Sequence, residues 1–154
     1  MNRTIIAVYG RQGKGKSDTI KKAALLLIEQ NPDANTTIKY DFKYDILLTI
    51  QIGSIKIGFE SQGDPKSRMI TEDTLRQLAD DKLNPEIGNC DIIVCASRTR
   101  GETVWKVDQI ADEYDFHTLW ISSFESPKLN HEVLNTIAAH NIINVLNSII
   151  KRQL

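Results

Sequence analysis

Eight consecutive residues near the N-terminus have types and spacing suited to holding phosphate groups. The segment Gly10–Ser17 (GRQGKGKS) follows the pattern G-x-x-x-x-G-K-[ST] and lies between a strand-like and a helix-like apolar run. Its glycines permit backbone angles that side chains would forbid, so successive N–H groups from Gly13 to Ser17 can point at an anion. Lys16 would give the β- and γ-phosphates a positive charge, and the Ser17 hydroxyl would be a ligand of Mg²⁺. The segment therefore predicts a site for a nucleoside triphosphate with magnesium.

The same eight residues resemble the Walker A motif of the P-loop NTPase superfamily. The resemblance covers the motif, and the rest of the chain adds a compatible order of elements. It implies phosphate binding by Gly13–Ser17, contact from Lys16 and magnesium ligation by Ser17. A dinucleotide-binding loop is the nearest rival, but the glycines of this segment do not have G-x-G-x-x-G spacing. We expect the nucleotide-binding residues to be Gly10, Arg11, Gln12, Gly13, Lys14, Gly15, Lys16, Ser17 and Asp18.

Acidic residues follow a second apolar run, where the rest of such a site should lie. Ligands of open α/β sheets sit beyond the carboxyl ends of the strands, and the strand-like IKIGF is followed by Glu60 and Asp64. Either acid could hold a magnesium-bound water or orient the nucleophile, and we assign Asp64 to the metal with Ser17. The spacing of Glu60 and Gly63 is similar to the D-x-x-G region of small GTPases, with glutamate in place of aspartate. The alternative is a purely structural Gly63-Asp64-Pro65 turn.

Two arginines follow another strand-like run, DIIVCA. Arg98 and Arg100 could clamp a transferring phosphoryl group. The alternative is that both are solvated residues beside a helix that Thr99 and Glu102 begin with a capping box. With Lys16, Glu60 and Asp64, these arginines complete the set of candidate catalytic residues.

The base of the nucleotide is less well specified. The segment Ser122–Glu125 ends the last predicted strand and is a candidate border of a base or substrate pocket. Guanine-specific GTPases carry N-K-x-D after a late strand, and neither Ser97–Arg100 nor Ser122–Glu125 resembles that motif. The sequence thus favours ATP over GTP.

Alternating elements are predicted to position these residues. We expect strands at 4–9, 91–96 and 116–122, and a hairpin with its turn at Gly53-Ser54 within about 44–59. We expect helices over 16–30, over about 71–83, from the Thr99 cap to about 114, and from Ser126-Pro127 to about 152. This order predicts a single α/β domain over residues 1–154, with the three-layer P-loop NTPase fold, a mainly parallel sheet and one antiparallel addition. The last helix has a broad apolar face, which should pack on the sheet, or on another subunit where it stays uncovered.

The composition favours an ordinary soluble domain. Of 154 residues, 41% are hydrophobic and 25% charged, and the net charge is −1, so no electrostatic feature points to nucleic acid or to a membrane as the partner. Cys90 and Cys95 have no Cys or His partners at metal-site spacing, and we expect two buried thiols. With neither a signal peptide nor a membrane-spanning run expected, the predicted location is the cytoplasm. A protein partner or a homo-oligomer stays open.

Three functions remain open from the sequence. The first is an ATPase that transfers the γ-phosphoryl group to water with Mg²⁺. The second is a small-molecule or nucleotide kinase, which needs an acceptor pocket and a lid. The third is a non-catalytic nucleotide sensor or GTPase-like switch, in which the segment from Glu60 to Met69 would respond to the ligand.

Overall fold

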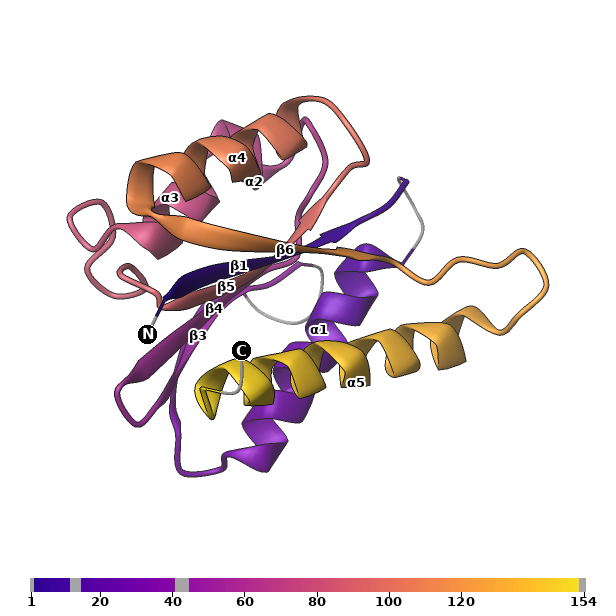
Figure 1. The fold of residues 1–154 in the computed structure, drawn as a ribbon, viewed down its shortest axis with the longest axis horizontal. Coiled ribbons are helices and arrows are strands. Elements are labelled where there is room, and N and C mark those ends of the chain that lie inside the picture. The colour runs from indigo at the N-terminus through magenta and orange to yellow at the C-terminus, as the bar shows by residue number, and fades with distance from the viewer. Residues whose placement is uncertain (1, 12–14, 41–44, 153–154) are drawn as a thin grey trace.

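A six-stranded, mostly parallel sheet is the middle layer of the computed structural model, which describes residues 2–11, 15–40 and 45–152 (Figure 1). The strands are β1 (Arg3–Tyr9), β2 (Asn35–Tyr40), β3 (Leu47–Ile52), β4 (Ile55–Glu60), β5 (Ile92–Ser97) and β6 (Phe116–Ser122). They lie in the order β2-β3-β4-β5-β1-β6. β4, β5, β1 and β6 run parallel, whereas β3 is antiparallel to both β2 and β4. This confirms the mixed α/β class, the mainly parallel sheet and the β3–β4 hairpin.

Five helices cover the two faces of this sheet. They are α1 (Lys16–Gln30), α2 (Arg68–Thr71), α3 (Thr74–Ala79), α4 (Glu102–Tyr114) and α5 (His131–Ile150). Figure 1 shows α1 and α5 together on one face and α2, α3 and α4 on the other. Because both faces are covered, the central strands β1 and β5 are apolar along almost their whole length.

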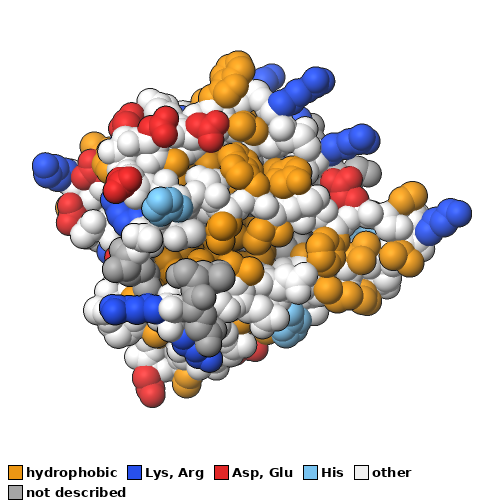
Figure 2. All heavy atoms as spheres, in the orientation of Figure 1, with side chains coloured by type: hydrophobic (Ala, Val, Ile, Leu, Met, Phe, Trp, Pro, Cys, Tyr) orange, Lys and Arg blue, Asp and Glu red, His pale blue; other side chains and the backbone are white. Residues whose placement is uncertain are grey.

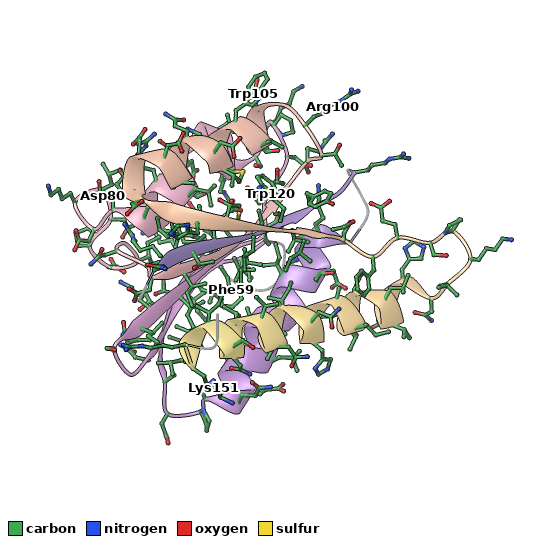
Figure 3. The ribbon with its side chains drawn as sticks, in the orientation of Figure 1. Phe59, Asp80, Arg100, Trp105, Trp120 and Lys151 are labelled. Atoms are coloured by element: carbon green, nitrogen blue, oxygen red, sulfur yellow. The ribbon has the colours of Figure 1, made fainter. Side chains whose placement is uncertain are left out.

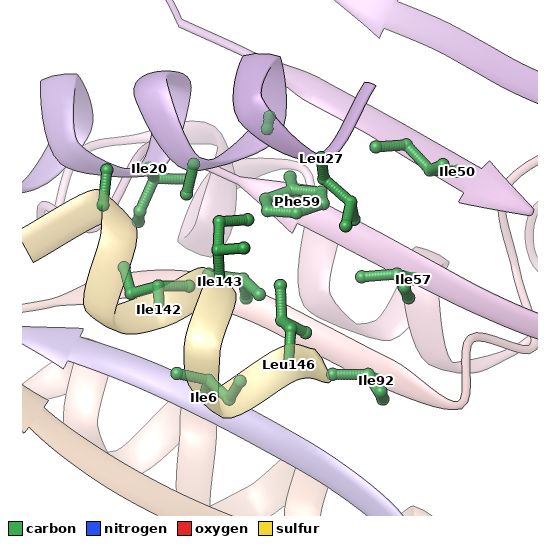
Figure 4. Close-up of a cluster of buried hydrophobic side chains, with 14 of the residues drawn as sticks. Ile6, Ile20, Leu27, Ile50, Ile57, Phe59, Ile92, Ile142, Ile143 and Leu146 are labelled. Atoms are coloured by element: carbon green, nitrogen blue, oxygen red, sulfur yellow. The ribbon is translucent and has the colours of Figure 1, made fainter. Parts of the chain in front are cut away.

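The larger core lies between the sheet and the α1–α5 pair. Figure 4 shows Phe59 of β4 at its centre, with Leu27 of α1 and Ile143 of α5 packed against it. All three side chains are almost fully buried. Cys90 and Cys95 are buried free thiols in the second core, as predicted. The two cores fix the carboxyl ends of the parallel strands relative to α1, and the candidate site lies there.

Several element boundaries differ from the prediction. β2 was not predicted, because its sequence NTTIKY is polar enough to resemble a loop. The helix predicted at about 71–83 is shorter in the structure, where α3 covers Thr74–Ala79. Its predicted start is wrong, because α2 ends at Thr71 and Asp73 takes a left-handed conformation (φ 52°) before α3 begins. The predicted capping box at Thr99 is also wrong, because Gly101 is the N-cap of α4 and no side chain caps it.

The last helix begins later than predicted. α5 starts at His131, and the Asn130 side chain caps it by accepting from the Val133 N–H, so Pro127 lies in the preceding loop. By length and composition α5 is apolar enough to be a candidate membrane span, unlike the prediction that no such run exists. In the structure it is a core helix packed against α1, within a compact α/β domain.

Candidate functional site

An open cleft of about 740 Å³ lies between the start of α1 and the segment that follows β4. We call its two sides the first wall and the second wall. The first wall is Gly15, Lys16, Ser17, Asp18 and Lys21 of the α1 start, and the second wall is Asp45 with residues 61–64, 66–68 and 71. The volume lies within the range of small-molecule and cofactor sites.

The first wall has a conformation that only glycine readily adopts. Gly15 is the N-cap of α1 with φ 82°, in the left-handed region, and a Cβ there would lie 2.5 Å from Oδ1 of Asn135 on α5. Asn135 also donates to Asp18 at 3.0 Å. Helix α5 therefore packs directly against the end of the glycine-rich segment. Gln12, Gly13 and Lys14 lie outside the described residues.

The Lys16 ammonium lies at the base of the cleft. Its Nζ donates to the carbonyl oxygens of Gly10 (2.7 Å) and Ser97 (3.0 Å), at the ends of the neighbouring strands β1 and β5. Burial lowers the pKa of Lys16, and the negative charges of Asp64 and Glu125 act in the opposite direction. The cation has no carboxylate of its own among the described ion pairs, so its charge is available to an anion in the cleft.

Ser17 faces an acid that the sequence analysis missed. The Ser17 hydroxyl donates to Oδ1 of Asp45 at 2.7 Å. Asp45 lies just before β3. Because β3 runs antiparallel to β4, its beginning lies at the same edge of the sheet as the carboxyl ends of the parallel strands. The search for acids at strand ends overlooked this position, although the predicted hairpin implied it.

Two further hydrogen bonds fix the Asp45 carboxylate. Oδ1 also accepts from the Ser61 hydroxyl at 3.0 Å, and Oδ2 accepts from the Gln62 amide at 3.0 Å. Gln62 is held at its other end as well, since its Oε1 accepts from the Arg68 N–H at 2.8 Å. Burial alone would raise the pKa of Asp45, but hydrogen bonds from Ser17, Gln62 and Ser61 outweigh it and the pKa is lowered. Asp45 is thus a fixed, ionised carboxylate beside Ser17.

Asp64 and Arg98 form an ion pair at the second wall. Nε of Arg98 donates to Oδ1 of Asp64 at 2.8 Å. The loop that carries Asp64 lies close to β5, because a Cβ on Gly63 would be 2.4 Å from the carbonyl carbon of Ala96. The structure therefore brings both predicted residues to the cleft side of the sheet, with Asp64 on Arg98 and a different acid on Ser17.

Glu60 lies behind the second wall rather than in the cleft. Its side chain is almost fully buried; Oε1 accepts from the Gln62 N–H, and Oε2 has no hydrogen-bond partner among the described residues. Burial holds its pKa well above the usual value, and the charge of nearby Asp45 adds to that effect. The Glu60 side chain lies among Tyr40, Leu47 and Thr74.

Other candidates lie apart from the cleft. Arg100 is exposed, and Figure 3 shows it projecting outward near Trp105 of α4. Arg11 lines a separate hollow of about 300 Å³ together with Phe124, Glu125 and His131. That hollow includes the end of the Ser122–Glu125 segment, which we considered for a base or substrate pocket.

The oxygen atoms around Ser17 fit a magnesium ion. Mg²⁺ prefers oxygen ligands and is usually held by one or two carboxylates together with substrate phosphates. Ser17 and Asp45 offer a hydroxyl and an ionised carboxylate side by side. Within the described residues, no group of three or more His, Cys, Asp or Glu side chains could hold an ion without such help.

Comparison of the chain with protein-family models, with curated proteins and with solved structures finds no match in any of the three. The function is therefore inferred from the residues and their geometry.

Proposed function

We propose that this chain is a P-loop nucleoside triphosphatase that binds a nucleoside triphosphate with Mg²⁺ and transfers the γ-phosphoryl group to water. The observation that carries the proposal is the 2.7 Å hydrogen bond from Ser17 to Asp45. It joins the last residue of the phosphate-binding motif to an ionised carboxylate from a distant element, and together they offer Mg²⁺ its protein ligands. ATP is the favoured nucleotide, on the sequence grounds given above.

Each wall has a distinct part in the proposed reaction. On the first wall, the backbone N–H groups at the start of α1 and the Lys16 ammonium bind the phosphates. Asp45 of the second wall and Ser17 of the first wall would hold Mg²⁺, which would supply positive charge to the phosphates. Arg98 places a guanidinium beside the cleft, where it offsets negative charge as the γ-phosphorus–oxygen bond breaks.

The oxygen of the attacking water forms the new bond to the γ-phosphorus and leaves in inorganic phosphate, and the displaced proton passes to the phosphate or to solvent. The bridging oxygen leaves with the nucleoside diphosphate. Asp64 and Gln62 are the polar groups on the second wall that can orient this water. Catalysis of this kind depends chiefly on positioning and on electrostatic stabilisation.

A small-molecule kinase is the second candidate, and one feature of the second wall favours it. Lys66, Ser67, Arg68 and Thr71 give the far side of the cleft two cations and two hydroxyls. The Arg68 guanidinium is stacked 4.0 Å from the centre of the Tyr40 ring, which restricts its position. An acceptor with an anionic group would find complementary charge there.

Calorimetric titration with ATP and GTP, with and without Mg²⁺, tests the proposal on the wild type, Lys16→Ala and Lys151→Ala. Lys151 is exposed just beyond α5 and serves as the matched control. Lys16→Ala should weaken nucleotide binding about tenfold to a hundredfold, because hydrogen bonds to charged groups contribute roughly 1.5–3 kcal/mol. Thermal unfolding checks that the variant is folded.

Equal affinity in Lys16→Ala and wild type would overturn the assignment. Phosphate release by the wild type then separates an ATPase from a kinase, whose release stays low until an acceptor is added. Tight binding without transfer under either condition would favour the nucleotide sensor.

A further inference from the structure

The two edges of the sheet differ in how they are protected from pairing with another strand. The β2 edge carries the exposed Lys39, and its register shifts between Ile38 and Tyr40. Lysines and irregular register are devices by which natural sheets prevent edge-to-edge association. β6 has neither: its sequence FHTLWIS contains no Lys, Arg, Asp, Glu or Pro, and it pairs regularly with β1 over all seven residues. The sequence of β6 suits an edge that is covered.

The surface around β6 is also unusually apolar. Five of the nine large hydrophobic residues that are exposed in the described structure lie on β6, in the loop before α5 or in the first two turns of α5: Leu119, Trp120, Leu129, Val133 and Ile137, each between 38% and 59% exposed. Figure 2 shows hydrophobic side chains gathered on this face, across the sheet edge and along α5. Gathered apolar side chains of this kind mark interaction sites on soluble proteins.

A strand edge restricts what can cover it. An edge strand presents unpaired N–H and C=O groups, which another strand satisfies and which the hydrocarbon of a lipid bilayer leaves unsatisfied. α5 has the composition of a membrane span. A bilayer that covered α5 and β6 together would, however, leave the backbone N–H and C=O groups of the β6 edge without hydrogen-bond partners. The partner that satisfies both the backbone groups of the edge and the apolar side chains around it is a β-strand with apolar residues beside it.

We propose that a second copy of this chain supplies that strand, through antiparallel pairing of β6 with β6 about a twofold axis at Leu119. Leu119 is the middle residue of the strand, so this register gives the longest overlap. It places Trp120 opposite Thr118 and Ile121 opposite His117, and no two carboxylates or ammonium groups oppose each other. Aromatic and β-branched pairs of this type stabilise antiparallel strands.

This pairing gives a closed dimer. Twofold pairing uses both β6 edges and leaves only the protected β2 edges at the two ends of the joined sheet, so a dimer forms instead of a fibre. The paired strands would provide about seven hydrogen bonds, compared with about ten in a typical protein interface. This proposal concerns assembly and is independent of the nucleotide chemistry.

Light scattering coupled to size exclusion tests the proposal on the full chain. The wild type should have twice the 17.4 kDa mass of one chain, and Leu119→Lys should halve the measured mass because it places two ammonium groups together at the axis. Trp105→Lys is the matched control, since Trp105 is 67% exposed on α4, away from the edge. It should remain a dimer.

A cysteine variant keeps the test decisive if Leu119→Lys fails to fold. Residues opposite each other in an antiparallel pair have Cβ atoms about 4.5–5.5 Å apart, so Leu119→Cys should form a disulfide-linked dimer on mild oxidation. Cys90 and Cys95 are buried and give little background, and Trp105→Cys should remain uncrosslinked. A monomeric wild type, with or without binding to phosphatidylcholine vesicles, would overturn the proposal, as would equal crosslinking of the two cysteine variants.

Discussion

The two walls of the cleft are built in different ways. Every residue of the first wall belongs to the stretch from Gly15 to Lys21, so one turn and the helix after it set its geometry. The second wall joins Asp45 to residues 61–71, and these meet only because β3 pairs antiparallel with β4. The difference teaches that the phosphate-binding half of the proposed site is a local structure, whereas the metal-binding half depends on the tertiary fold.

Among the variants considered, Asp45→Ala should have the largest effect, and it should act on magnesium-dependent ATP binding alone. It removes the carboxylate beside Ser17 and the common partner of Ser61 and Gln62. We expect the gain in ATP affinity that Mg²⁺ provides to fall about tenfold to a hundredfold, which is typical when groups that position a metal are lost. Affinity for ATP without Mg²⁺, which depends on the first wall, should stay close to that of the wild type.

Calorimetry at several Mg²⁺ concentrations measures both quantities. Asp112→Ala, at an exposed position on α4, controls for the loss of one negative charge. If the magnesium dependence of ATP binding were unchanged in Asp45→Ala, Asp45 would not be a ligand of Mg²⁺. Asp64 would then be the better candidate for the metal.

The same difference explains what the sequence could predict. Gly10–Ser17 was identifiable because its chemistry depends on consecutive residues. Asp45 was not, because its role arises from the direction of β3. The predicted hairpin contained the missing signal: a strand that runs opposite to its parallel neighbours begins where they end, so the residue before β3 was also a candidate.

Short-range conformations account for most of the other differences. Asp73 adopts a left-handed conformation between α2 and α3, which apolar periodicity does not reveal. Glu60 is the last residue of β4, and alternation along the strand directs it to the face beneath α3. Asp64 lies in the loop after β4, and that loop reaches the cleft. Acidic residues after a predicted strand therefore indicate which loop borders the site. They do not indicate toward which face of the sheet each side chain points.

Arg98 and Arg100 can be compared to test whether the arginine paired with Asp64 contributes to phosphate release. Arg98→Gln should lower the turnover number for phosphate release about tenfold. That is less than the roughly 10²–10³-fold cost of losing a dedicated donor to the transition state, because Arg98 is partly exposed and already paired with Asp64. Arg100→Gln should change turnover by less than about twofold, as expected for an exposed charge. Steady-state phosphate release measures both, and equal losses in the two variants would show that the Asp64 pair has no special role.

Glu60→Gln should have the smallest effect on the site and a measurable one on stability. Burial raises the pKa of Glu60 in the folded chain well above its ordinary value of 4.5. Between these two values the folded state binds more protons than the unfolded state, so the free energy of unfolding falls as the pH rises through that window. Glutamine keeps the oxygen that accepts from the Gln62 N–H and cannot ionise.

The variant should therefore lose this part of the pH dependence and gain stability over the wild type as the pH rises above 4.5. Urea unfolding across a series of pH values measures the effect, with the exposed Glu29→Gln as control. ATP affinity should not change, because Glu60 lies behind the second wall and outside the cleft. Parallel stability curves together with weakened ATP binding would instead place Glu60 in the site, and the second wall would then extend through the sheet to its other face.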